Sequence, residues 1–164
     1  MAKIRIHEKT IETVVQKYAK MVYKLAYART GSKSDADDIF QEAFLRYIRY
    51  GKGFENDEHE KAWLIRVTIN CCNDLYRNRT IRKEEVLFAE SMIMNDSDQE
   101  VKDLLLALPE KYRTVLHLHY FEDMRISDIA ELLELSDSAV KMQLSRARTM
   151  LKENIERGEE NVQG

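Results

Sequence analysis

The segment from Leu108 to Leu151 is the most informative part of this chain and reads LPEKYRTVLHLHYFEDMRISDIAELLELSDSAVKMQLSRARTML. It contains three consecutive helical patterns, and the last has apolar residues on one face and Lys and Arg on another. Ser136 is a favourable N-cap for this last helix, and Asp137 adds a negative charge to its first turn. Residues 134–136 leave room only for a tight corner between the second and third helical patterns, so these two are predicted to form a helix-turn-helix.

The last helix is the candidate DNA-reading element. Its apolar residues, from Val140 to Leu151, recur at helical spacing and should face the core. The second helix of a helix-turn-helix enters the major groove with its N-terminal side chains. A Lys- and Arg-rich face can also be an ordinary solvated surface, but the cap, the corner and an amphipathic helix predicted over residues 111–120 favour DNA binding. The candidate contacts are Ser138, Lys141, Met142 and Ser145, with Arg146 and Arg148 on the flanks.

Composition predicts an all-α protein. The 164 residues are 44% apolar and include five Gly and one Pro, which leaves little turn chemistry for a sheet. No apolar run is long enough for a membrane span or a signal peptide, so we expect a cytoplasmic protein with no membrane insertion.

The residues that could carry chemistry do not form a recognisable site. Cys71 and Cys72 are adjacent and have no CxxC partner, and His117 and His119 point to different sides of a helix. We therefore expect no metal site and no cofactor. The chain also lacks a nucleophile–base set, so we expect no catalytic residues, no enzyme activity and no small-molecule substrate.

An acidic stretch divides the chain. Residues 84–100 carry six acidic residues and no Lys or Arg, which indicates a linker. The predicted fold is therefore two small helical domains, residues 1–83 and 101–158, with a polar tail at 159–164. The net charge of −3 makes the chain a poor freestanding DNA binder, because neutralising phosphates supplies most non-specific affinity. A partner that holds the chain near DNA is expected.

Three helices are predicted in the N-terminal half, over about residues 8–29, 34–50 and 60–79, with Ser34 as N-cap of the second. The second helix buries one apolar face. Its opposite side is either an ordinary surface or a docking face for a basic partner helix. The residues of that side are Asp38, Gln41, Glu42 and Leu45.

The third helix carries a polar row opposite its core face. Arg can contact phosphate or guanine and Asn can bond a base edge, so the row suits nucleic acid, although a solvated face has the same pattern. Phe54, isolated among polar residues just before this helix, is either a core plug or a platform for an unstacked base, and Trp63 should pack in the core. The row consists of Arg66, Asn70, Asn73 and Arg77.

Two blocks of this sequence resemble a known family. DADDIFQEAFLRYIRY (35–50) and KAWLIRVTINCCNDLYRNR (61–79) are similar to region 2 of bacterial sigma factors of the extracytoplasmic-function (ECF) class. LPEKYRTVLHLHYFEDMRISDIAELLELSDSAVKMQLSRAR (108–148) is similar to region 4 of the same class. The two blocks occur in the correct order and cover nearly the whole chain.

The resemblance implies partners and roles. Asp38, Gln41, Glu42 and Leu45 would dock on the β′ clamp coiled coil of core RNA polymerase, and the β flap and an anti-sigma factor would be further partners. Phe54 and Asn70, with Arg66, Asn73 and Arg77, would hold the melted −10 strand and a flipped base. Lys141, Met142, Ser145 and Arg146 would read the −35 duplex, with His119 at a phosphate. The acidic linker would thread toward the RNA exit path.

The chain departs from the family pattern in region 4. Asp123 and Glu134 stand where the family often has Gly, Arg125 replaces a small capping hydroxyl, and Ser138 and Ala139 replace Gly-Thr. Because Met142 and Ser145 offer little direct readout, promoter preference would depend partly on DNA shape. The alternative function is a freestanding helix-turn-helix regulator that binds duplex DNA without polymerase.

Overall fold

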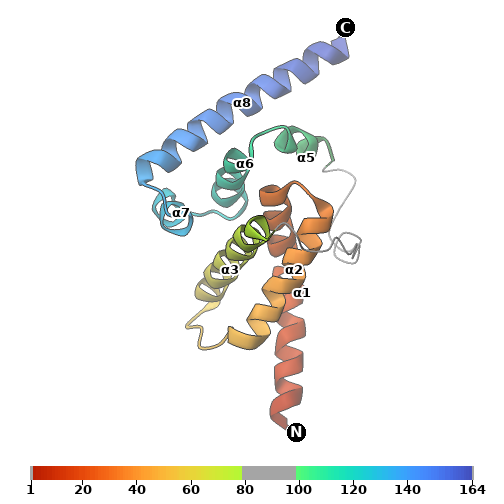
Figure 1. Cartoon of the computed structure of the whole chain (residues 1–164), viewed down its shortest axis with the longest axis vertical. Coiled ribbons are helices and arrows are strands. Elements are labelled where there is room, and N and C mark those ends of the chain that lie inside the picture. Colours follow the sequence, from red (N-terminus) through yellow and green to blue (C-terminus); the bar gives the residue numbers. More distant parts are fainter. Residues whose placement is uncertain (1, 79–98, 164) are drawn as a thin grey trace. The chain divides into compact units, whose positions relative to one another are not determined.

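The computed structural model describes residues 2–78 and 99–163, and the regular secondary structure in these two ranges is entirely helical (Figure 1). The chain divides into two compact units, residues 1–93 (unit 1) and 94–164 (unit 2). The prediction of an all-α protein with two helical domains is confirmed. Most of the predicted acidic linker, residues 84–98, lies outside the described residues. Neither described range contains a helix long and apolar enough to cross a bilayer.

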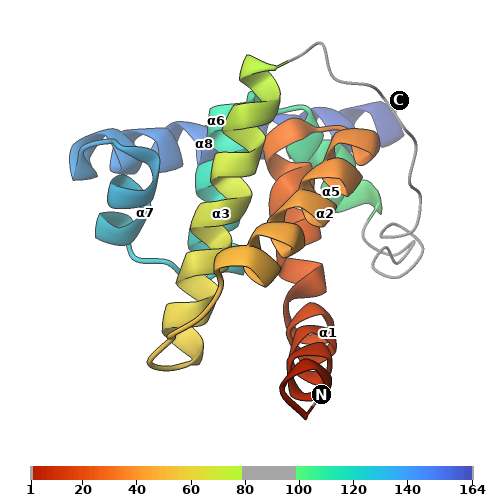
Figure 2. The ribbon, with the colours of Figure 1, turned by 60° about the horizontal axis from the view of Figure 1, so that its bottom comes forward.

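Unit 1 is a bundle of α1 (Ala2–Thr30), α2 (Lys33–Tyr50) and α3 (Asp57–Arg77), in which each helix packs against the other two (Figure 2). Burial of each large apolar side chain contributes about 1.5–3 kcal/mol to stability. The core includes Val22, Tyr23, Leu25, Ala36, Ile39, Ala43, Leu64, Ile69 and Cys72.

The helix starts in unit 1 differ from the prediction. Ser34 is not the N-cap of α2: Ser32 is, and its Oγ accepts the N–H of Asp35 at 3.2 Å. The reason is that Gly31, at φ 68°, ends α1 and reverses the chain, which leaves Ser32 extended directly before α2. Likewise α3 begins at Asp57 because Asn56 caps it, with Oδ1 accepting the N–H of His59 at 2.8 Å.

The adjacent cysteines are packing residues of α3. Both are buried and free, and burial raises the pKa of the Cys71 thiol to about 11. No cluster of potential metal ligands occurs among the described residues.

Unit 2 contains α5 (Gln99–Leu106), α6 (Glu110–Leu116), the π-helical turn η2 (His117–Phe121), α7 (Ile126–Leu133) and α8 (Asp137–Gln163). The helix predicted over residues 111–120 is therefore α6 followed by a π-helical turn. The predicted helix-turn-helix is confirmed as α7, a corner and α8, and Ser136 Oγ accepts the N–H of Ala139 at 3.1 Å. α8 continues through most of the predicted polar tail. The core includes Leu108, Val115, Leu118, Ile129, Val140, Leu144 and Ala147.

The two turns that flank α7 place non-glycine residues in the left-handed region. Asp123 has φ 51° and Glu134 has φ 57°. Glu134 ends α7, and its N–H bonds to the carbonyls of Ala130 and Glu131. Arg125 sits at the N-cap of α7 without a side-chain cap bond. The backbone thus keeps the conformation that glycine would favour, although the chain has acidic residues at both positions.

Candidate nucleic-acid interface

The exposed face of α8 begins immediately after the Ser136 cap. Val140, Leu144 and Ala147 fix the helix against the core of unit 2, so its other side faces solvent. Met142 is 49% exposed and is a large apolar side chain with no core role. This face therefore presents two cations among small polar and apolar groups, a composition suited to a DNA groove. The exposed candidates are Ser138, Lys141, Met142, Ser145 and Arg146.

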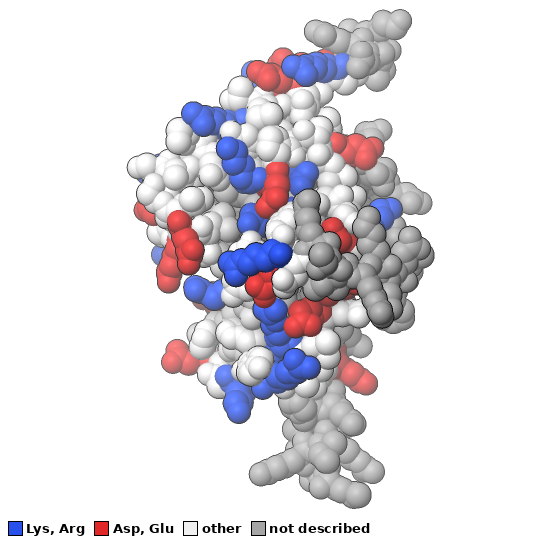
Figure 3. All heavy atoms as spheres, viewed as in Figure 1, with Lys and Arg blue, Asp and Glu red and all other residues white. Residues whose placement is uncertain are grey.

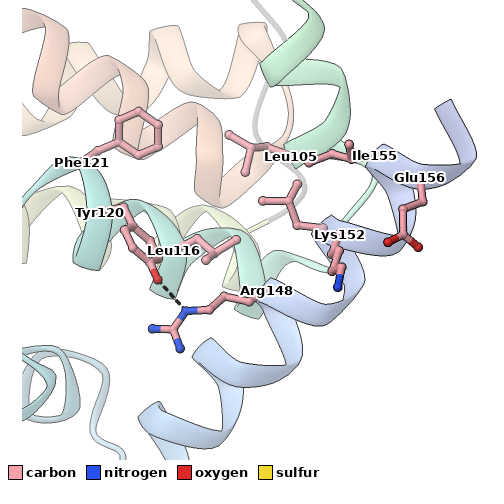
Figure 4. Close-up of a pocket in the computed structure, with 9 residues that line it drawn as sticks. Leu105, Leu116, Tyr120, Phe121, Arg148, Lys152, Ile155 and Glu156 are labelled. Carbon is pink, nitrogen blue, oxygen red and sulfur yellow. Dashed lines mark hydrogen bonds between the residues drawn. The ribbon is translucent and has the colours of Figure 1, made fainter. Parts of the chain in front are cut away.

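Arg148 is placed differently from the other candidates. Its Nε donates a hydrogen bond to the Tyr120 hydroxyl, and its guanidinium lies over the Tyr120 ring at 5.6 Å (Figure 4). The side chain is therefore held toward the π-helical turn. Arg148 also borders a groove of about 670 Å³, and the apolar residues that line this groove include Leu105, Phe121 and Ile155.

His119 is half-buried and belongs to the same turn. Its Nδ1 lies 3.1 Å from the Met124 carbonyl oxygen, to which it donates, and its ring meets Tyr120 edge-on at 4.9 Å. With Nδ1 used in this way, Nε2 can donate to a phosphate only when the ring is doubly protonated.

The polar row on α3 is mostly solvent-facing. Arg66, Asn70 and Arg77 are exposed. Asn73 is half-buried, and its Oδ1 accepts a hydrogen bond from Arg29 Nη2 at 3.0 Å, which ties the row to α1. Three of the four predicted −10 contacts on this helix are thus exposed, and one of these three, Arg77, lies 3.9 Å from Asp74 Oδ1 in an ion pair.

Phe54 packs in an aromatic cluster, defined as Tyr47, Phe54, His59 and Trp63. Its ring centroid lies 5.9 Å from Tyr47, 5.4 Å from His59 and 5.6 Å from Trp63. The Tyr47 hydroxyl donates to Glu60 Oε2 at 2.8 Å, and burial raises the pKa of this phenol. The core-plug interpretation of Phe54 matches these contacts, and its half-buried ring keeps part of its surface accessible.

Sequence reasoning did not single out His59, whose ring contacts Phe54 and accepts the backbone N–H of Glu55. The signal that could have found it is its place three residues after a capping Asn, directly before the predicted third helix.

The candidate docking face of α2 combines acidic and apolar groups. Leu45 is 45% exposed and Gln41 is exposed, while Asp38 and Glu42 are half-exposed. Ile48, which the sequence analysis did not select, extends the apolar part of this face at 43% exposure.

Arg46 connects this face to α3, and sequence reasoning also missed it. Its Nε donates to Glu42 Oε1 at 3.1 Å, and its Nη2 donates to Asp74 Oδ2 at 2.8 Å. The hydrogen bond to Asp74 is the main cause that raises the pKa of the guanidinium, which is charged at every physiological pH. Arg46 therefore fixes the Glu42 carboxylate relative to the third helix.

Charge on the described surface is mixed. On the face drawn in Figure 3, Lys and Arg are interspersed with Asp and Glu and do not form one continuous basic patch. This agrees with the small net charge of −3.

Two family models match this chain. Residues 14–81 match sigma-70 region 2, and residues 98–151 match sigma-70 region 4. The first match covers most of unit 1 and the second covers the helix-turn-helix of unit 2.

Two curated relatives match this chain over most of their own length. The ECF RNA polymerase sigma factor SigW of Bacillus subtilis is 26% identical, and the alignment spans 87% of each chain. SigM of the same organism is 28% identical over 91% of this chain and 97% of SigM.

Solved structures share the fold. CnrH, in complex with the cytosolic domain of CnrY, has a TM-score of 0.64 at 25% identity, covering 92% of this chain and 90% of CnrH. The sigma factor RpoE of Bartonella quintana, in complex with the anti-sigma factor NepR, has a TM-score of 0.69 at 20% identity, covering 90% and 98%.

Proposed function

Because this chain belongs to the sigma-70 family, in its ECF class, and so directs transcription initiation, we propose that unit 1 docks on core RNA polymerase and both units hold promoter DNA. The observation that carries this proposal is the match of two regions, in family order, to two separately cored units. The polymerase performs the chemistry, and this chain selects the start site.

Unit 2 is proposed to bind the −35 duplex through α8. Lys141 and Arg146 supply charge for phosphate or guanine, and Ser138, Met142 and Ser145 fill the groove beside them. Arg148 and His119 are assigned to phosphates at the edge of the site. Arg148 must leave Tyr120 or contact DNA with its remaining N–H groups, since its Nε is already bonded.

Unit 1 is proposed to hold the melted −10 strand. Arg66 and Arg77 are exposed and suited to the backbone, and Asn70 and Asn73 are suited to base edges. Phe54 is assigned to a flipped base. Extruding that base costs a few kcal/mol, so a site that retains it favours the open state.

Three protein partners are proposed. Asp38, Gln41, Glu42 and Leu45 form a face that suits a basic helix with an apolar stripe, which we assign to the β′ clamp coiled coil. The apolar groove beside η2 suits the β flap. An anti-sigma factor is proposed because the structurally similar RpoE is solved in complex with the anti-sigma factor NepR. The chain is proposed to act in the cytoplasm without cofactor or metal.

Transcription in vitro tests the proposal. Purified bacterial core polymerase is supplied with genomic DNA fragments, with and without this chain, and the RNA 5′ ends are mapped. We expect new start sites that share a −35 and a −10 sequence only when the chain is present. If no start site depends on the chain and the chain does not bind core polymerase, the proposed function is wrong.

A charge-reversal pair locates the docking face. The double substitution Asp38→Lys and Glu42→Lys should weaken core binding at least about tenfold, because it places like charge against a basic partner. The matched control, Glu12→Lys with Glu55→Lys, makes the same charge change at exposed positions off this face. If the two double variants bind core polymerase equally well, the docking face does not lie on this side of α2.

A further inference from the structure

His59 makes two contacts with the loop of residues 51–56, which joins α2 to α3. Its ring Nδ1 accepts the backbone N–H of Glu55 at 3.2 Å. Its own backbone N–H donates to Asn56 Oδ1 at 2.8 Å. The ring bond requires the tautomer with its proton on Nε2. The described residues offer the Glu55 N–H no backbone carbonyl, so His59 is its acceptor.

The same ring supports Phe54. The two rings are nearly perpendicular, at 89°, with centroids 5.4 Å apart. Phe54 also packs on Tyr47 and Trp63, so the loop is held at Glu55 by a hydrogen bond and at Phe54 by aromatic contacts. Gly53, at φ 74°, has no side chain to anchor this segment.

We propose that His59 is a positioning residue for −10 recognition: by accepting the Glu55 N–H and packing on Phe54, it fixes the loop of residues 51–56 in the conformation that receives the melted strand. This inference depends on the proposed function, because that function brings the strand to this loop. His59 itself does not contact DNA in this proposal.

The first experiment needs neither polymerase nor DNA. Trp63 is the only tryptophan of the chain and belongs to the aromatic cluster, so its acrylamide quenching in the full-length protein reports how well the loop covers it. His59→Asn keeps an acceptor near the Nδ1 position, whereas His59→Leu, which also branches at Cγ, has none. Glu58→Ala is the control in the same turn. Thermal unfolding followed by circular dichroism checks that each variant is folded.

We expect His59→Leu to raise the quenching constant of Trp63, and His59→Asn and Glu58→Ala to leave it near the wild-type value. Equal quenching in His59→Leu and wild type would overturn the proposal. So would an increase of the same size in His59→Leu and His59→Asn, since the acceptor would then be irrelevant.

The second experiment measures promoter opening by the reconstituted holoenzyme, using permanganate reactivity at a promoter mapped as above. His59→Leu should lower the open fraction about three- to tenfold, the effect of losing one hydrogen bond, while core binding is unchanged and His59→Asn restores opening. If wild-type protein gives no holoenzyme, the proposed function fails, yet the Trp63 result still decides whether His59 orders the loop. Wild-type opening by His59→Leu would refute the positioning role.

Discussion

Glu134 holds a backbone conformation that favours glycine, at the end of α7. Its φ of 57° costs an L-residue about 1–2 kcal/mol, and its exposed side chain has little packing to lose. We therefore expect Glu134→Gly to raise the free energy of unfolding by about 1 kcal/mol. Urea unfolding of the full chain measures it.

A second glycine variant separates the relief of backbone strain at Glu134 from the general effect of glycine on the conformational entropy of the unfolded chain. Glu153→Gly lies inside α8, where glycine lowers stability by about 1 kcal/mol. Opposite signs for the two glycine variants are expected, and a loss of stability in both would argue against strain at the corner.

Cys71 should be unreactive in the folded protein. Burial raises its thiol pKa to about 11, so the thiolate is scarce at pH 8. The sign of the pH dependence follows from this raised pKa, because the folded state holds the thiol proton more tightly than the unfolded state does. The contribution of Cys71 to the free energy of unfolding is therefore fully present below the unfolded pKa of about 8.5 and is lost as pH rises toward 11. A thiol reagent at pH 8 should label Cys71 and Cys72 only after denaturant is added. Rapid labelling of native protein would contradict the buried placement.

At this scale, the sequence predicted which residues are buried better than it predicted backbone conformation. Ser136 was identified as a cap because it directly precedes a clear apolar pattern. Ser34 was chosen wrongly because Ser32 has the same capping chemistry, and only the reversal at Gly31 decides between them. Phe54 could not be assigned from sequence because its neighbours Tyr47 and Trp63 come from two other segments of the chain.

α8 is the element that should set −35 affinity. Replacing Lys141 and Arg146 with Ala removes two exposed cations from its outer face. If both contact phosphate, the slope of log affinity against log salt should become smaller by about 2, and −35-dependent initiation should fall. Holoenzyme binding to promoter duplex at several salt concentrations measures the slope.

Arg157→Ala is the matched control, since it removes an exposed cation from the same helix beyond the proposed site. An unchanged salt slope in the double variant would mean that the reading face lies elsewhere.

The pairing of α2 with α3 depends partly on Arg46. Its side chain and that of Asp74 are partly exposed, so we discount the ion pair for solvent screening and expect a coupling energy of about 0.5–1 kcal/mol. A double-mutant cycle with Arg46→Ala and Asp74→Ala, followed by urea unfolding, measures it. Arg49→Ala, an exposed residue of the same helix, should cost little. A coupling energy of zero would remove Arg46 as a link between the helices.

Elements with strong helical periodicity were predicted with errors of a few residues at their ends. The π-helical turn was missed because the apolar pattern of residues 111–120 continues through it, and periodicity does not distinguish a widened turn. The roles of the candidate site residues stay predictions, but the exposed faces of α2, α3 and α8 that carry most of them were predictable from helical spacing. Arg46 and His59 were not, because their partners are fixed only by packing and loop geometry.

For the whole molecule, the small negative net charge predicts weak binding to DNA by the chain alone. We expect purified protein to bind promoter duplex at least about a hundredfold more weakly than the holoenzyme at 0.15 M salt, because polymerase adds contacts and raises effective concentration. Fluorescence anisotropy with labelled promoter measures both. Tight, sequence-specific binding without polymerase would instead support a freestanding regulator.

Each unit buries its own core, and this has a genetic consequence. A substitution that unfolds the helix-turn-helix should leave unit 1 folded, so if unit 1 docks on polymerase as proposed, the damaged protein would still occupy the enzyme without finding a promoter. Such alleles would interfere with the wild-type copy in the same cell, whereas alleles that unfold the first half would be recessive.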